Sequence, residues 1–245
     1  MQKHLKTGFL MMVVMTVITG LAYPALITVV AQTALRDRAN GSLIEVNGQV
    51  VGSRLLGQRF TRPEYFHPRP SAAGAGYDPT ASGGTNLGPT NAKLFNGTIK
   101  LDDKKNDIVD FDGLKLRIVH YCVENGLPFD ASRPLASFTD TKGGLDDVAL
   151  IKAFNDERAP LTVVPRTPLP ADAVTASASG LDPHISPRNA EFQAARVAKA
   201  RGVSIGRVQT LVARHTQPRT LGILGEPAVN VLELNLALDE QFRAK

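Results

Sequence analysis

Residues 7–35 read TGFLMMVVMTVITGLAYPALITVVAQTAL and contain no charged side chain. A bilayer core requires roughly 20 mostly apolar residues in helical form, so this run is long enough to cross it. Only helices and closed barrels span lipid, because every backbone amide must find a partner inside the segment. We therefore expect residues 1–6 to be a short tail, 7–35 a transmembrane helix region, and 36–245 one folded domain.

A cleaved secretory signal peptide is the alternative interpretation of this run. Lys3, His4 and Lys6 form a basic start, and Gly20-Leu21-Ala22 resembles a cleavage site with small residues at both ends. The apolar character nevertheless resumes at residues 25–31, which a cleaved protein would have to bury at its new N-terminus. The length of the run favours an uncleaved anchor.

Two residues near the middle of the run predict a kink or local unwinding of the helix. Pro24 lacks an amide donor and its ring clashes one turn back, and Gly20 lies just before it. The alternative is that Pro and Gly are simply common in membrane helices. A docking role for Gly20 and Pro24 in the membrane therefore stays open at this point.

The flanking charges do not decide the orientation of the span. Lys3 and Lys6 precede it, and Arg36 and Arg38 follow it, so the positive-inside count is nearly balanced. The lone Cys122 cannot form an intramolecular disulfide and says nothing about the redox compartment.

Composition and motifs exclude several classes of function. The net charge of +5 is spread without a run of Lys or Arg, so nucleic acid is not expected as a partner. No Walker A loop or zinc-binding His-Glu-x-x-His helix occurs. Asp110 and Asp112 resemble part of a calcium loop, but Ile108 and Val119 occupy its first and last ligand positions. We expect no catalytic residue and no metal site in this chain.

Hydrophobic spacing and turn residues predict a mixed helix and strand domain. Residues 45–53 should form a hairpin around Asn47-Gly48, and the Gly/Pro-rich residues 63–91 an ordered loop. Helices are expected over 111–125, from Ser186 to about Arg201, after Ser204, and over 229–242, where strand-like alternation competes with helical spacing. Residues 160–170 should be extended. The expected fold class is a single N-terminal transmembrane helix followed by one mixed α/β (α+β) extracytoplasmic domain.

Four blocks, in this order behind a single span, carry a family resemblance. They are ANGSLI at 39–44, the stretch from GQRF at 57–60 through YFHPRPS at 65–71 to ASGGTNL at 81–87, VTASASGLDPHISP at 174–187, and GEPAVNVLELNLALD at 225–239. The chain resembles the C subunit of the Kdp potassium-transporting ATPase, the KdpC family. The resemblance leaves out residues 93–169, which we interpret as an insert relative to the usual family length.

The resemblance implies an accessory subunit of an ATP-driven, high-affinity potassium uptake pump in the bacterial inner membrane. The N-terminus would be cytoplasmic and the domain periplasmic. The implied partners are a P-type ATPase subunit, a channel-like potassium-binding subunit and a small single-span subunit, together with membrane lipid. ATP and potassium would belong to the complex, and no cofactor is expected to bind this chain directly.

Two mechanisms follow from the resemblance. In the first, the subunit is a catalytic chaperone that raises the ATP affinity of the ATPase subunit. Ser82, Gly83, Gly84 and Thr85 faintly resemble a nucleotide-contacting signature, although small residues also suit a tight turn. In the second, the domain caps the periplasmic mouth of the potassium pathway. The docking candidates are Phe60, Tyr65, Phe66, His67, Arg69, Asn86, Ser177, Ser179 and Asp182.

A different class of protein is also compatible with the residues alone. A secreted or membrane-anchored periplasmic binding module, unrelated to transport, would have the same composition. If it were secreted, its mature N-terminus would begin near Tyr23. Its release from the membrane by a salt or alkaline wash would separate the two interpretations.

Overall fold

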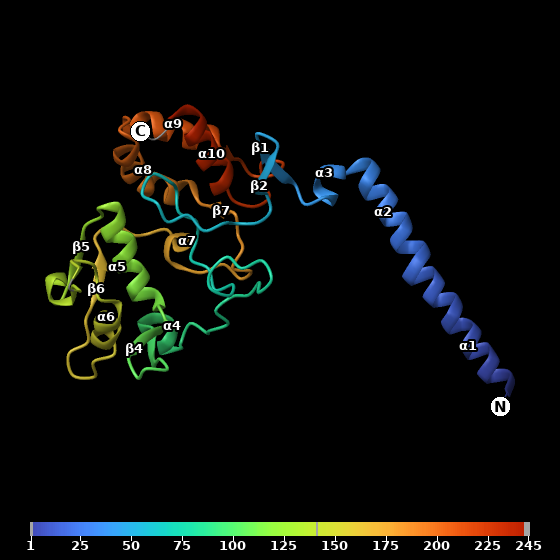
Figure 1. Ribbon diagram of the computed structural model, residues 1–245, viewed down its shortest axis with the longest axis horizontal. Coiled ribbons are helices and arrows are strands. Elements are labelled where there is room, and N and C mark those ends of the chain that lie inside the picture. The colour runs from blue at the N-terminus through green and yellow to red at the C-terminus, as the bar shows by residue number, and fades with distance from the viewer. Residues whose placement is uncertain (1, 141, 243–245) are drawn as a thin grey trace. The chain divides into compact units, whose positions relative to one another are not determined.

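A computed structural model describes residues 2–140 and 142–242 of the chain. The described chain divides into two compact units, 1–55 and 56–245, and each is considered by itself. The first holds the long N-terminal helix and a hairpin, and the second holds the folded domain (Figure 1).

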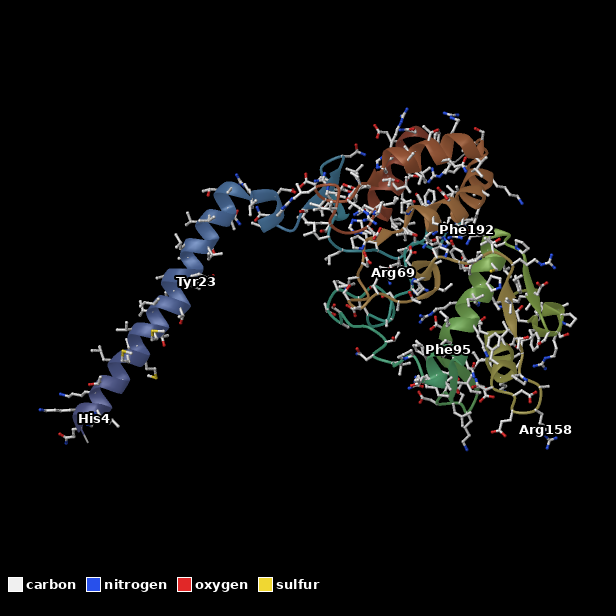
Figure 2. The ribbon with its side chains drawn as sticks, turned by 180° about the vertical axis from the view of Figure 1, so that it is seen from behind. His4, Tyr23, Arg69, Phe95, Arg158 and Phe192 are labelled. Carbon is white, nitrogen blue, oxygen red and sulfur yellow. The ribbon has the colours of Figure 1, made fainter. Side chains whose placement is uncertain are left out.

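The apolar run forms one continuous helical rod. α1 (Gln2–Val17) passes through a single π-helical turn (Ile18–Ala22) into α2 (Tyr23–Ala34). Its most apolar stretch has a mean hydropathy of 2.1, and none of it is buried. Figure 2 shows side chains such as His4 and Tyr23 projecting outward from the rod. A fully exposed apolar helix requires an apolar surrounding, as a bilayer provides.

The π-helical turn lies where the sequence predicted a departure from regular helix. It contains Gly20 and ends just before Tyr23-Pro24, so Pro24 stands at the start of the next α-helical segment. Proline is tolerated there because its ring and missing amide disturb only the preceding turn.

The hairpin of the first unit follows the short helix α3 (Arg36–Ala39). β1 (Leu43–Val46) pairs antiparallel with β2 (Gln49–Ser53), and Val46 faces Gln49 across the turn. Asn47 and Gly48 both have positive φ, 54° and 77°, which is the geometry of a type I′ hairpin turn. The prediction from Asn47-Gly48 is confirmed.

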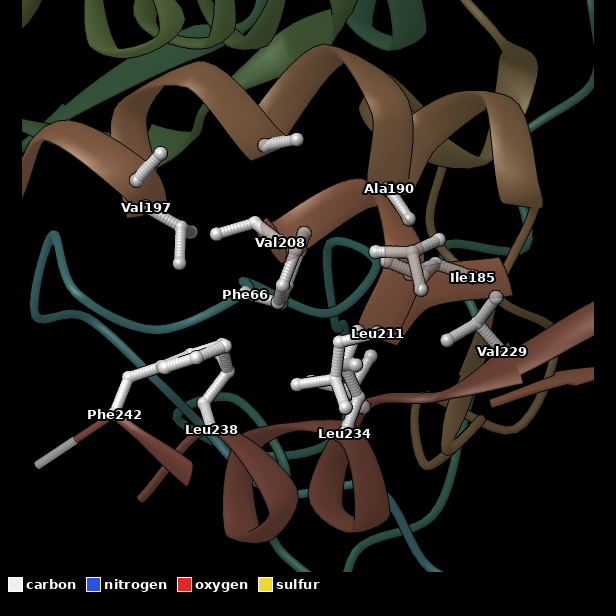
Figure 3. Close-up of a cluster of buried hydrophobic side chains, with 14 residues drawn as sticks. Phe66, Ile185, Ala190, Val197, Val208, Leu211, Val229, Leu234, Leu238 and Phe242 are labelled. Carbon is white, nitrogen blue, oxygen red and sulfur yellow. The ribbon is translucent and has the colours of Figure 1, made fainter. Parts of the chain in front are cut away.

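The C-terminal half of the domain is a helical layer over a small antiparallel sheet. The sheet has the order β7-β9-β8, with β7 (His184–Ile185), β9 (Ala228–Asn230) and β8 (Thr216–Gln217). The helices are α8 (Pro187–Arg201), α9 (Ile205–Arg214) and α10 (Val231–Gln241). Figure 3 shows their apolar faces meeting around Phe66, Val208 and Leu234.

The helix ends of this half follow the predicted signals. Ser186 accepts a hydrogen bond from the Asn189 amide at 3.1 Å and precedes Pro187, and Gly202 ends α8 in the left-handed conformation. The last helix was predicted from residue 229 but begins at Val231. The preceding residues 228–230 form β9 instead, because they pair with both β7 and β8.

The middle of the domain, residues 92–174, has its own small core. Its elements are α4 (Ala92–Asn96), β3 (Thr98–Leu101), β4 (Asp107–Phe111), α5 (Gly113–Asn125), β5 (Phe129–Ala131), a 3-10 turn (Leu135–Phe138), α6 (Asp147–Phe154), β6 (Val163–Pro165) and α7 (Ala171–Val174). β3 pairs with β4, and β5 with β6. Val119, Leu150 and Leu161 are fully buried among these elements.

α5 joins the middle region to the C-terminal half. One side packs on α6, and Tyr121 on another side packs with Ala173 and Val174 of α7. The Tyr121 hydroxyl donates to Asn189 Oδ1 of α8 at 2.8 Å. The predicted extended segment 160–170 contains β6. The helix predicted over 111–125 is α5, but it begins at Gly113, because Phe111 ends β4 and pairs with Thr98.

Candidate functional site

The long Gly/Pro-rich segment has no helix or strand between residues 63 and 91, yet buried side chains hold its backbone. The Gln193 side chain pairs with His67: the His67 amide donates to Gln193 Oε1 at 2.7 Å, and Gln193 Nε2 donates to the His67 carbonyl at 3.0 Å. Asn235 pairs with the Phe66 main chain in the same way. The two side-chain amides therefore give the loop backbone the hydrogen-bond partners that a neighbouring strand supplies in a sheet.

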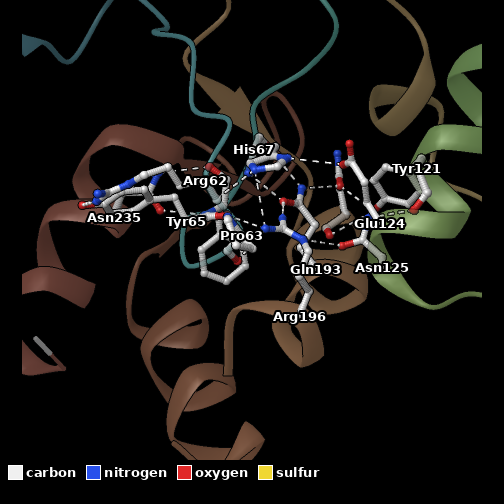
Figure 4. A network of polar contacts seen from close by, with 12 residues as sticks. Arg62, Pro63, Tyr65, His67, Tyr121, Glu124, Asn125, Gln193, Arg196 and Asn235 are labelled. Atoms are coloured by element: carbon white, nitrogen blue, oxygen red, sulfur yellow. Dashed lines mark hydrogen bonds and ion pairs between the residues drawn. The ribbon is translucent and has the colours of Figure 1, made fainter. Parts of the chain in front are cut away.

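Arg196 of α8 donates hydrogen bonds to backbone carbonyl groups of the same loop (Figure 4). Its Nη1 donates to the carbonyls of Pro63 at 2.7 Å and Tyr65 at 2.9 Å, and its Nε donates to Asn125 Oδ1 at 3.0 Å. Burial lowers the pKa of Arg196 from its ordinary value, although Glu124 opposes this shift. The fork of guanidinium donors thus fastens the loop to both α8 and α5.

Arg201 fixes the start of the loop against the C-terminal helix. It donates to the carbonyl of Glu64 at 2.8 Å and to Asp239 Oδ1 at 2.7 Å. The guanidinium groups of Arg201 and Arg62 lie 5.1 and 4.8 Å from the ring centre of Tyr65, and the Tyr65 hydroxyl donates to Asp239 Oδ2 at 2.8 Å. Burial and this carboxylate raise the pKa of Tyr65.

A second set of contacts joins the loop to residues 176–184. Arg69 Nη1 lies 2.9 Å from Asp182 Oδ2, and Ser71 Oγ donates to the Gly180 carbonyl at 2.6 Å. Burial raises the pKa of Asp182, but hydrogen bonds from His184 and Arg69 outweigh it and the pKa is lowered. The Tyr77 hydroxyl donates to the Arg69 carbonyl at 2.6 Å, and burial raises its pKa. Asp182 is therefore an ionised partner of Arg69.

The segment proposed for nucleotide contact packs against residues 178–179. The Gly83 amide and the Ser82 hydroxyl both donate to the Ser179 carbonyl at 2.9 Å. A Cβ placed on Gly84 would lie 2.9 Å from the Ala178 carbonyl oxygen, so only glycine permits this approach. Since the Gly83 amide already has an acceptor, it is not directed at an external phosphate.

The predicted docking residues fall into buried and accessible groups. Phe66 is fully buried in the core and Ser177 is nearly so, so neither side chain is available on the surface of the domain. Asn86 and Ser179 are exposed, and Asn86 has a φ of 52°. The remaining candidates are partly exposed: Phe60, Tyr65, His67, Arg69 and Asp182. Docking by the accessible residues remains a prediction.

The residues that hold the loop were not among those predicted from the sequence. Gln193 and Asn235 are each 1% exposed, among apolar neighbours on α8 and α10. A polar side chain at a core position of an amphipathic helix must find a partner, and that signal could have identified them. The helical spacing does not identify those partners, because His67 lies 126 residues before Gln193 and Phe66 lies 169 residues before Asn235.

A cavity of about 730 Å³ lies between the loop and α5, lined by residues that include Pro63, His67, Glu124 and Arg196. His67 Nδ1 lies 3.5 Å from Glu124 Oε2, and this contact lowers the pKa of Glu124. An adjoining cavity of about 390 Å³ also contacts His67 and Glu124 and is bordered by Asp112 and Arg117, which pair with each other. The two linings together therefore contain charges of both signs, with more basic than acidic side chains.

The described residues provide no cluster for metal chemistry. Across residues 2–140 and 142–242, no three His, Cys, Asp or Glu side chains converge to hold a metal ion. Cys122 is buried, and burial raises the pKa of its thiol, so it is a packed side chain rather than an activated nucleophile. The arrangement is suited to holding a surface in a fixed shape.

A protein-family model matches most of the chain. The family model "KdpC: K+-transporting ATPase, c chain" matches residues 5–107 and 133–240. Part of the predicted insert, 93–107 and 133–169, therefore lies inside the match, and 108–132 lies between the matched ranges.

Individual relatives align along nearly the whole chain. The Potassium-transporting ATPase KdpC subunit of Koribacter versatilis is 46% identical over 239 residues, covering 98% of this chain and 95% of that protein. The subunits of the same name from Mycobacterium bovis (strain BCG / Pasteur 1173P2) and Gemmatimonas aurantiaca are each 44% identical, covering 98% of this chain and 99% and 94% of those proteins. With its membrane-spanning N-terminal helix and this match, the chain belongs to the KdpC family, the c chain of potassium-transporting ATPases.

Proposed function

We propose that this chain assembles with and stabilises the other subunits of the pump while doing no bond-making chemistry itself. The partners are a P-type ATPase subunit, a channel-like potassium-binding subunit and a small single-span subunit. The N-terminus is cytoplasmic and the domain faces the periplasm of a bacterial inner membrane. The observation that carries the proposal is the unburied apolar rod of residues 2–34 on a chain that the family model matches along most of its length.

The ordered loop of the domain supports the second mechanism, in which the domain caps the periplasmic mouth of the potassium pathway. A docking surface binds more tightly when its backbone is ordered before binding, because ordering on binding costs free energy. Gln193, Asn235, Arg196 and Arg201 supply that order to the 63–67 segment. The cap would stabilise the assembly and shape the approach of ions.

A role as catalytic chaperone requires an indirect mechanism. A periplasmic domain cannot touch cytoplasmic ATP, so a change in ATP affinity would be a coupling free energy, typically about 1–3 kcal/mol. The Gly83 amide already donates to Ser179, which favours packing over nucleotide contact for Ser82–Thr85. Any effect on ATP affinity would act through the ATPase subunit.

Purification of the pump tests the proposal. The full chain should co-purify in detergent with the P-type ATPase subunit, and removing it should abolish potassium-stimulated ATPase activity. Recovery of the chain by itself, with that activity intact in its absence, would overturn the proposal. An intact N-terminus and release only by detergent would exclude a secreted binding module. Release by an alkaline wash with a mature start near Tyr23 would support that alternative.

A reporter fusion tests the orientation. A reporter joined to the C-terminus should be active when it requires the periplasm and inactive when it requires the cytoplasm. The reverse result would place the domain beside ATP and would revive direct nucleotide contact through Ser82–Thr85.

A further inference from the structure

His67 and Glu124 connect the Gly/Pro-rich loop to the last turn of α5 (Figure 4). His67 Nδ1 lies 3.5 Å from Glu124 Oε2, and the two side chains are 21% and 47% exposed. Gln193 of α8 holds the main chain of His67, so the position of the ring is set by the C-terminal half. Glu124 belongs to the middle region. The contact is therefore a link between these two parts of the domain.

Both ring nitrogens of His67 face groups that accept hydrogen bonds. Nε2 lies 3.1 Å from the Arg62 carbonyl oxygen, and Nδ1 faces the Glu124 carboxylate. A neutral imidazole carries one N–H and can donate to only one of these acceptors, whereas the protonated ring donates to both. Proton binding therefore adds a hydrogen bond at the ring and an attraction between opposite charges across the link.

The charged groups nearest to His67 act in both directions. Arg196 Nη1 lies 3.5 Å from His67 Nε2, and its positive charge opposes protonation of the ring. Glu124 favours it, and Glu124 stays ionised in mild acid because the hydrogen bond from His67 lowers its pKa, although burial opposes this shift.

Other side chains that can carry a charge between pH 5 and 9 share a cavity lining with His67. They come from α5 and its N-cap (Asp112, Arg117, His120), from α8 (Lys199) and from the loop and the segment before it (Arg69, Arg59). Asp112 pairs with Arg117, and His120 pairs with Asp147 of α6. Because His120 is the second histidine of this set, its contribution must be separated from that of His67.

Apolar packing does not fill the space beside the contact. The cavity of about 730 Å³ borders His67, Glu124 and Asn125. Polar contacts also join this end of α5 to α8, from Arg196 to Asn125 and from the Tyr121 hydroxyl to Asn189. An end of a helix held mainly by polar contacts beside a cavity opens locally at low cost, so a change in one contact alters how often it opens.

We propose that His67 and Glu124 form a pH-sensitive clasp, which holds the end of α5 to the Gly/Pro-rich loop more tightly when His67 is protonated. The middle region is then attached more firmly to the C-terminal half in acidic than in alkaline medium. Both members of the clasp belong to this chain, so the clasp operates without the other subunits and does not depend on the proposed function.

Hydrogen exchange of the full chain in detergent tests the clasp. The Gly126 and Leu127 amides donate to the carbonyls of Val123 and Cys122, so their exchange reports opening of the end of α5. The reference protein carries His120→Gln, which removes the contact of His120 with Asp147. After correction for the intrinsic exchange rate, protection of residues 121–127 should be roughly two- to fivefold higher at pH 5.5 than at pH 8.5, as for a partly exposed ion pair.

Two substitutions added to this reference should abolish the difference. His67→Gln cannot gain a charge, and Glu124→Gln removes the carboxylate but keeps the shape of the side chain. The matched control is His215→Gln, at the end of α9, which should keep the full difference. If His67→Gln does not fold, Glu124→Gln decides, because its side chain is half-exposed and the main-chain contacts of His67 remain.

The midpoint of the change identifies the titrating group. The pH at which protection falls by half should coincide with the midpoint of the His67 ring titration, followed by NMR in the same protein. Equal protection of the reference at both pH values, or a pH difference that survives in folded His67→Gln or Glu124→Gln, would overturn the clasp. Neither result would bear on assembly of the pump, because only the isolated chain is measured.

Discussion

The Asn235 side chain forms a reciprocal pair of hydrogen bonds with the main chain of Phe66. The Phe66 amide donates to Asn235 Oδ1 at 2.9 Å, and Asn235 Nδ2 donates to the Phe66 carbonyl at 3.0 Å. Both residues are buried, and the contact joins α10 to a loop 169 residues earlier in the chain. This pair fixes the depth at which the Phe66 ring enters the core.

Replacing Asn235 with Ala should destabilise the domain strongly. The change leaves an amide and a carbonyl of Phe66 without partners in the core, and each such group costs about 1–3 kcal/mol. We expect a loss of roughly 2–5 kcal/mol in denaturant unfolding of the full chain in detergent. Gln241→Ala, at an exposed position of the same helix, should change stability by less than about 0.5 kcal/mol. Equal effects of the two variants would refute the role of the pair.

Replacing Arg196 with Lys should loosen the 63–67 segment although the charge is kept. A lysine ammonium cannot reach the carbonyls of Pro63 and Tyr65 together with Asn125 in the fork geometry that Arg196 uses. We expect a loss of about 1–3 kcal/mol and faster proteolysis within residues 60–69. Lys199→Arg, on the exposed side of α8, is the control. Wild-type protease resistance in Arg196→Lys would contradict the prediction.

Gly83→Ala and Gly84→Ala distinguish packing from nucleotide contact. At Gly84 the added Cβ meets the Ala178 backbone at 2.9 Å, so we expect a destabilisation of about 1–3 kcal/mol from overpacking. At Gly83 the nearest atom lies 3.9 Å away, and stability should change by less than about 0.5 kcal/mol. For each of the two variants, the free energy of unfolding of the chain and the ATP affinity of the assembled pump are measured. A folded Gly83→Ala chain that lowers ATP affinity would instead support nucleotide contact.

The His120–Asp147 contact should make stability depend on pH. The His120 ring lies 2.7 Å from Asp147 Oδ1, and this hydrogen bond raises the pKa of His120 above its ordinary value despite burial. Because the folded-state pKa is raised, the contribution is complete below about pH 6.5, the unfolded value, and is lost as pH rises through the folded pKa. His120→Gln should therefore destabilise the chain more at pH 5.5 than at pH 8.5.

A double-mutant comparison checks the origin of that pH dependence. In an Asp147→Asn background the carboxylate partner is gone, so His120→Gln should cost similar amounts at both pH values. Unfolding temperatures of the four proteins at each pH supply the measurement. A pH dependence of the same size in the Asn background would assign the effect to other groups near α5, among them Glu124 and Asp112.

Local signals in the sequence predicted the long N-terminal helix, the β1–β2 hairpin and the helices α5, α8, α9 and α10, but not α4, α6 or most of the short strands. Three of these signals act within a few residues of the chain: the Asn47-Gly48 turn, the Ser186 cap with Pro187, and the end of α8 at Gly202. They can therefore be identified from the local sequence alone. The start of the last helix was misplaced by two residues. Residues 228–230 became a strand because β7 and β8 pair with them, and sequence spacing does not report partners from elsewhere in the chain.

The order of the Gly/Pro-rich loop was predicted, but the side chains that hold it were not. The Gly/Pro-rich loop was expected to be ordered, and the structure shows how: Gln193, Arg196, Arg201 and Asn235 bind its backbone. Phe66 was a docking candidate but lies in the core. An aromatic side chain in a loop can point into the core or toward solvent. For Phe66 this is decided only by its packing against α8, α9 and α10.

The sequence by itself determined the membrane span and the family. An uncharged apolar run must avoid water whatever it is attached to, and long ordered blocks identify relatives without any coordinates. Only the tertiary structure decided which polar side chains hold the loop, why Gly84 must be glycine, and that the His67 ring lies beside Glu124. Those properties depend on groups distant in the sequence meeting in space, and no local pattern encodes such a meeting.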